Sequence, residues 1–127
     1  MLLHSIRVSL MAFAAALILT ACGGGSSTKP EPPVGGITVV PGDTQATISW
    51  LATPGVEYWI YVAPNNANLN LENWLETAGS TYRLNVTSPY VFTGLTNGTP
   101  YSFFLTGRIN QGPGSDATPT VTVTPQP

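Results

Sequence analysis

The sequence predicts an all-β domain built from two antiparallel sheets packed face to face. Charged residues make up only 8% of the 127-residue chain, which contains 13 glycines and 12 prolines. Short runs that alternate apolar and polar residues are separated by turns rich in these two residue types. This combination favours short strands over helices. Apolar residues that recur at every second position lie on one face of a strand and can face a core. The chain length allows one domain with short extensions.

The first 21 residues resemble the signal peptide of a bacterial lipoprotein. His4 and Arg7 precede an apolar run at residues 9–19 that is too short to cross a bilayer comfortably. The run ends in Leu-Thr-Ala-Cys, which is similar to the lipobox of that family. The resemblance implies cleavage before Cys22 and covalent lipid on its sulfur, which would hold the protein on a membrane. The alternative is an ordinary secretory signal in which Cys22 is incidental.

Residues 22–35 are predicted to form a tether between this lipidated cysteine and the domain. Its first half is Gly-Gly-Gly-Ser-Ser, which is flexible, and its second half contains Lys-Pro-Glu-Pro-Pro, which is stiffer and extended. The lipoprotein resemblance implies a place in the bacterial cell envelope. Gly23 stands where the family's inner-membrane retention signal has Asp, which favours the outer membrane.

Seven strands are predicted in the remaining chain. They occupy residues 37–40, 46–50, 56–62, 82–86, 90–95, 101–108 and 118–124. The third strand alternates most clearly, with Tyr58 and Ile60 on one face and Trp59 and Tyr61 on the other. An Asn-rich connection at residues 63–80 separates the third and fourth strands, and Asn70 can cap a short helical turn within it.

A tight corner is predicted between the fifth and sixth strands. Asn97-Gly98 is a turn signal, because Gly adopts positive φ freely and Asn tolerates it. Leu95 is followed six positions later by Tyr101, which is typical of a tyrosine corner. In that motif the ring packs in the core and its hydroxyl bonds back to the corner's backbone.

The order of these packing motifs resembles the fibronectin type III domain. In chain order they are Pro-Gly-Asp at 41–43 with Ser-Trp at 49–50, Tyr-x-Ile-Tyr at 58–61, and Phe-Thr-Gly-Leu-x-Asn-Gly-x-x-Tyr-x-Phe at 92–103. The resemblance covers residues 36–125 and implies a seven-stranded immunoglobulin-like β-sandwich. An immunoglobulin domain would have a cysteine pair and its Trp on the third strand. The residues expected at the centre of the core are Trp50, Tyr58, Leu95 and Tyr101.

The inventory of reactive side chains predicts a protein that is not an enzyme. His4 and Cys22 are the only histidine and the only cysteine. The first leaves with the signal peptide and the second is lipidated, so imidazole and thiol chemistry are excluded from the mature domain. We therefore expect no catalytic residue, no metal and no cofactor beyond the lipid. Only Lys29, Arg83 and Arg108 are cationic after residue 22, which excludes phosphate-driven binding of nucleic acid.

The outer face of the third and sixth strands is the candidate binding face. If Tyr58 and its alternates face the core, the side chains expected on the solvent side are Trp59, Tyr61, Phe104 and Arg108. Trp, Tyr and Arg are enriched in binding hot spots, and exposed aromatic patches are unusual. The alternative is that the Asn-rich connection folds over this face, with Trp74 or Leu75 as the cover.

The sequence thus predicts a membrane-anchored binding module that recognises a protein or a carbohydrate. The alternative is a structural or assembly subunit of the cell envelope that has no soluble ligand. The sequence does not indicate an oligomeric state. Both hypotheses rest on the fold class and on the aromatic face, because fold alone does not define function.

Overall fold

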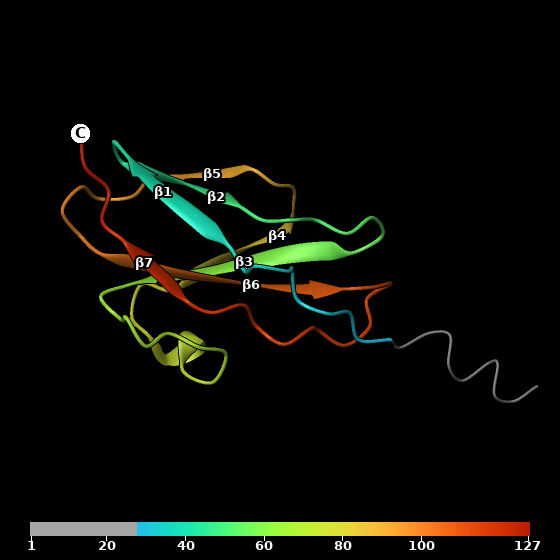
Figure 1. Ribbon diagram of the computed structural model, residues 1–127. Coiled ribbons are helices and arrows are strands. Elements are labelled where there is room, and N and C mark those ends of the chain that lie inside the picture. The colour runs from blue at the N-terminus through green and yellow to red at the C-terminus, as the bar shows by residue number, and fades with distance from the viewer. Residues whose placement is uncertain (1–27) are drawn as a thin grey trace, which may run out of the picture.

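The computed structural model describes residues 28–127; the predicted signal peptide and Cys22 lie outside this range. Seven strands and one short 3-10 helix form the described part of the chain (Figure 1). They are β1 (Thr38–Gly42), β2 (Gln45–Ser49), β3 (Glu57–Pro64), η1 (Trp74–Glu76), β4 (Thr81–Val86), β5 (Tyr90–Thr93), β6 (Tyr101–Arg108) and β7 (Val121–Val123). No helix within residues 28–127 has the length and apolar character needed to cross a bilayer.

The strands form two sheets that lie one above the other. One sheet has the order β1-β2-β5 and the other has the order β4-β3-β6-β7, with every pairing antiparallel. Figure 1 shows the two layers, with η1 below the four-stranded sheet on the side away from the other sheet. The predicted seven-stranded sandwich is therefore confirmed, and each predicted strand corresponds to an observed one.

The core lies between the sheets and follows the predicted alternation. On the four-stranded sheet, Ile60 pairs with Leu105 and Val62 pairs with Phe103, and all four side chains are buried. The four residues expected at the centre of the core are Trp50, Tyr58, Leu95 and Tyr101. The first three are buried, and Tyr101 is half-buried and packs against the same cluster. Burial of such side chains supplies most of the driving force for folding.

The predicted tyrosine corner is present. The Tyr101 hydroxyl accepts a hydrogen bond from the backbone N–H of Thr96 at 3.0 Å. Asn97 then ties the corner to the β1–β2 turn: its Oδ1 accepts from the N–H of Thr44 at 2.8 Å, and its Nδ2 donates to Oδ1 of Asp43 at 2.8 Å. Asn97 therefore joins the corner between β5 and β6 to the β1–β2 hairpin.

The last strand is shorter than predicted because side chains replace part of its backbone pairing. Residues 118–120 were expected to be strand, whereas β7 begins at Val121. The Thr118 hydroxyl accepts from the N–H of Leu105 at 3.0 Å, and the Ser115 hydroxyl accepts from the N–H of Gly107 at 2.9 Å. These hydroxyls satisfy buried donors of β6 without a regular ladder.

The described end of the expected tether lies against the domain. Pro30 and Pro33 are buried, and Nζ of Lys29 is 2.8 Å from Oδ1 of Asp116. A turn closes the segment, with the N–H of Gly36 donating to the Pro33 carbonyl at 3.0 Å. Residues 29–36 are thus a packed strap, which differs from the free tether that their composition predicted.

Candidate functional site

The four residues of the predicted binding face lie together on the outer side of the four-stranded sheet. Tyr61 and Phe104 are partners across β3 and β6, and their rings stack with centroids 4.7 Å apart. At the other end of the same two strands, Cζ of Arg108 lies 3.6 Å from the ring centroid of Trp59, which is cation–π geometry. The predicted grouping is therefore present.

The expected exposure of this face is wrong at its centre. Tyr61 is 7% exposed and Phe104 is 0% exposed, and Trp59 and Arg108 are only partly exposed. The connection between β3 and β4 folds over the two rings and places the buried Leu69 and the half-buried Trp74 against them. The physical reason is that two large aromatic faces lose contact with water when a nearby loop supplies apolar side chains.

Trp74 provides the cover, and Leu75 does not. The edge of the Trp74 ring meets the Tyr61 ring with centroids 5.1 Å apart and planes at 87°. Its Nε1 donates to the carbonyl of Thr81 at 3.1 Å, which fixes the indole over the sheet. Leu75, the next residue, is 78% exposed and is not part of the buried cluster. The alternative in which the connection covers this face is therefore the one that the structure shows.

Asparagine side chains hold the covering connection in shape. Oδ1 of Asn70 accepts from the N–H groups of Glu72 and Asn73 at 2.8 and 3.0 Å, as predicted for a capped turn. Oδ1 of Asn66 accepts from the N–H of Asn68 at 3.0 Å. These side chains replace missing backbone partners in a loop. The segment before β7 also holds the connection, because the Thr120 hydroxyl donates to the carbonyl of Leu69 at 2.7 Å.

An apolar groove remains beside this cover. It encloses about 500 Å³ and runs between the covering connection and β4. Its lining residues are Trp59, Tyr61, Leu71, Trp74, Leu75, Tyr82 and Leu84. Four of them, Leu71, Leu75, Tyr82 and Leu84, are large and substantially exposed. A contiguous exposed apolar surface is typical of a site that contacts another molecule.

The groove contains residues that sequence reasoning did not single out. Tyr82 and Leu84 lie on the outer face of β4, and Leu71 comes from the covering connection. The available signal was the alternation within β4, where Tyr82 and Leu84 are separated by Arg83, whose guanidinium lies over the Phe92 ring on the inner side. No sequence period relates Leu71 to these two residues, so their meeting could not be predicted.

A polar cluster surrounds Trp59, which lines the groove. Nε1 of Trp59 donates to the Glu57 carboxylate at 2.6 Å. With its amide nitrogen turned toward the same carboxylate, Asn85 lies 2.7 and 3.1 Å from the two oxygens. Together with Arg108 over the face of the indole, these contacts hold the Trp59 ring at a fixed angle. A preorganised aromatic side chain loses little entropy on binding.

The free edge of β4 is poorly suited to pairing with another strand. Asn85 has a positive φ of 53°, and the β3–β4 register shifts between Tyr58 and Ile60. The carbonyls of Thr81 and Tyr82 accept hydrogen bonds from the Trp74 and Arg83 side chains, and one of these two consecutive carbonyls points to the free edge. Bulges and side-chain caps of this kind protect edges from strand addition. A partner at this site would therefore contact side chains rather than extend the sheet.

Acidic side chains lie near the groove. Residues 28–127 contain no histidine and no cysteine. Within that range, no three acidic, histidine or cysteine side chains come close enough to hold a metal ion. Glu72 and Glu76, which flank the groove leucines in sequence, are exposed to solvent. The groove thus offers an apolar floor with acidic residues nearby.

The strand order, the division into three- and four-stranded sheets and the tyrosine corner define a fibronectin type III sandwich. Solved domains of this kind are similar. They include the FN5 domain of Drosophila Lar, with a TM-score of 0.56 and 17% identity over 80% of this chain and 98% of that chain. They also include the fibronectin type-III domain of human fibronectin type III domain containing protein 3 (TM-score 0.59, 17% identity, 82% of this chain and 93% of that chain) and the fn3 domain of human collagen alpha-1(XX) chain (TM-score 0.56, 19% identity, 82% and 92%). No protein-family model and no curated protein matches the chain. The likeness is therefore one of fold.

Proposed function

We propose that this protein is a lipid-anchored bacterial envelope protein whose fibronectin type III-like domain binds an apolar segment of a partner protein in the groove. The observation that carries the proposal is the groove between β4 and the covering connection, where Leu71, Leu75 and Leu84 are exposed side by side with Tyr82. The lipobox-like sequence before Cys22 supports the anchor, and the absence of histidine and cysteine from residues 28–127 supports a non-enzymatic role.

The lining of the groove favours a protein segment over a carbohydrate. A sugar carries many hydroxyl groups, and each one that is buried without a hydrogen-bond partner costs free energy. Leucine side chains offer no such partner, whereas they pack well against leucine, methionine or aromatic groups. Glu72 and Glu76 favour a segment flanked by lysine or arginine, since complementary charge guides association.

The binding site is tested by photo-crosslinking in cells from position 84. Leu84 is 45% exposed in the groove, and Val91 is 44% exposed on the other sheet, so a crosslinker at Val91 is a matched control. We expect a discrete adduct from position 84 that is lost when Leu71→Asp is added, and no such adduct from position 91. Absence of an adduct from position 84, or the same adduct from both positions, would contradict the proposed site.

The mass of the adduct identifies the kind of partner. A band with the mass of two copies would identify a second copy of this chain, which is one of the two outcomes that the assembly-subunit alternative predicts, the other being a fixed complex with another protein. A band of another mass would identify a separate partner. The anchor is tested on its own by metabolic labelling with a fatty acid, which we expect to be lost in Cys22→Ala.

A further inference from the structure

The strap formed by residues 29–36 packs along one end of the sandwich. Pro30 and Pro33 are buried, and Lys29 is paired with Asp116. Further along, Gly36 lies close to Pro119: a Cβ added to Gly36 would be 3.5 Å from Cδ of the Pro119 ring. The strap therefore runs beside the segment before β7. The chain therefore enters the domain at the end where β3 begins and β6 ends, and Figure 1 shows the C-terminus at the opposite end.

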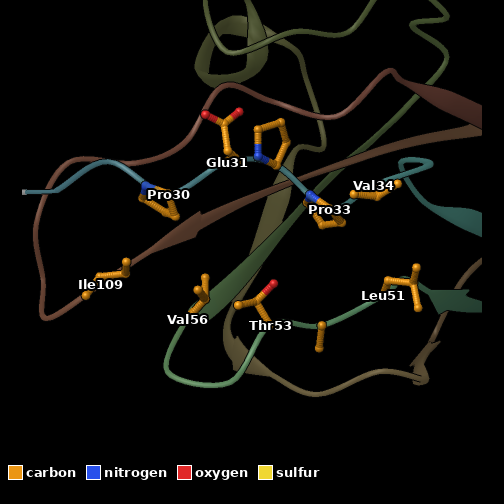
Figure 2. A pocket seen from close by; sticks show the side chains of 10 residues that line it. Pro30, Glu31, Pro33, Val34, Leu51, Thr53, Val56 and Ile109 are labelled. Atoms are coloured by element: carbon orange, nitrogen blue, oxygen red, sulfur yellow. The ribbon is translucent and has the colours of Figure 1, made fainter.

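A second apolar hollow lies under this strap. It encloses about 580 Å³, and its apolar lining includes Pro30, Pro33, Val34, Leu51, Val56 and Ile109. Figure 2 shows the strap crossing above the segment that carries Leu51 and Thr53, with Ile109 at the far side. Val34 is 80% exposed and Leu51 is 68% exposed. This end of the domain thus presents apolar side chains to its surroundings.

The position of Cys22 limits what this end can face. Thr28 is six positions after Cys22, and six residue steps span at most about 20–22 Å when fully extended. If Cys22 carries the lipid, the strap end must stay within that distance of the bilayer. The strap therefore shortens the free tether, which leaves the exposed Val34 and Leu51 within reach of the lipid surface.

We propose that the apolar end formed by Val34, Leu51 and Ile109 rests on the membrane that holds the anchor. This inference depends on the proposed lipidation of Cys22. The nearby charges offer no net positive charge: Lys29 is paired with Asp116, and Glu31 is acidic and exposed. Contact therefore comes from apolar side chains and does not require anionic lipid. In this orientation the strap fixes which end of the sandwich meets the bilayer and leaves the groove accessible.

The test uses the full lipidated protein in phosphatidylcholine vesicles. Acylation consumes the only native thiol, so Leu51→Cys supplies a single site for an environment-sensitive fluorophore. Leu75→Cys is the matched control, because Leu75 is a comparably exposed leucine beside the groove. We expect lipid-borne quenchers to remove most of the fluorescence at position 51 and little at position 75. Adding Pro30→Gly and Pro33→Gly should release the strap and weaken quenching at position 51.

The outcomes separate this inference from the proposed anchor. Quenching at position 75 equal to or greater than that at position 51 overturns the orientation. No quenching at either position, in protein whose mass shows an acylated Cys22, overturns the membrane contact and leaves the anchor intact. Unmodified Cys22 in the mature protein overturns both. Unchanged quenching after the two proline substitutions overturns the orienting role of the strap.

Discussion

The four-stranded sheet buries aromatic side chains on both faces, but the two faces are covered by different kinds of structure. On the inner face, Phe103 packs edge-on against Phe92 of the opposite sheet, with ring centroids 6.1 Å apart. On the outer face, Phe104 is equally inaccessible to water, yet its cover is the connection that contributes Leu69 and Trp74. The first cover is held by backbone ladders, and the second is held by turns and a few side-chain hydrogen bonds.

This difference teaches that equal burial does not imply equal stabilisation. A strand within a sheet cannot move into a cavity without breaking several backbone hydrogen bonds. A loop pinned at a few points can shift and fill part of the lost volume. The cost of removing a buried side chain depends on how well its surroundings collapse. The outer cluster is therefore expected to open locally at a lower free energy than the core.

The largest effect is expected from Phe103→Ala. The ring is fully buried between the two sheets, so its removal leaves a cavity that neither sheet can close. We expect a loss of about 3–5 kcal/mol in the free energy of unfolding, which is a large share of the stability of a domain of this size. Urea denaturation followed by tryptophan fluorescence measures it. A loss no greater than that in Phe104→Ala would break the distinction between the two faces.

Phe104→Ala is expected to cost less, about 2–3 kcal/mol, because the covering connection can settle onto Tyr61. Amide hydrogen exchange adds a local measure. Exchange at residues 66–80 should accelerate, while exchange in β2 and β6 should follow global stability. Slow exchange in residues 66–80, unchanged from the unsubstituted protein, would show that the connection is as firmly held as the core.

The same contrast explains which features the sequence could predict. Alternation along β3 and β6 correctly predicted the core at Tyr58 and Ile60, and Asn97-Gly98 followed by Tyr101 correctly predicted the corner. The fate of Tyr61 remained open, because its cover comes from a connection without a period. The choice of Trp74 over Leu75 depends on the turn that Asn70 caps.

The strap and the groove were also beyond sequence reasoning. The composition of residues 29–33 is that of an extended linker, and nothing in it indicates a hollow lined by Val56 and Ile109. Burial of Pro33 depends on where distant segments end in space. Likewise, the groove exists because the covering connection stops short of Leu84 and leaves its side chain exposed.

A smaller effect is expected from Tyr101→Phe, which keeps the ring in the core and removes the bond to the N–H of Thr96. We expect a loss of about 0.5–1.5 kcal/mol, the usual net value of one hydrogen bond. Tyr101→Ala would remove the packing as well and should cost more. Similar losses of unfolding free energy in Tyr101→Phe and Tyr101→Ala would mean that the hydroxyl, rather than the ring, accounts for the contribution of Tyr101 to stability.

The smallest effect on stability is expected from a substitution in the strap, which is a third kind of cover. The strap contains Lys29, which forms with Asp116 the only ion pair within residues 28–127. The hydrogen bond to Asp116, and then its charge, raise the pKa of Lys29 above the ordinary value of 10.5. Any stability that the Lys29–Asp116 pair contributes is therefore fully present below pH 10.5 and is lost as the pH rises through the raised pKa of Lys29. Because both side chains are largely exposed, Lys29→Met should leave the unfolding midpoint at pH 7 unchanged within error. A clear fall that disappears in high salt would show that charge, rather than the buried prolines, holds the strap.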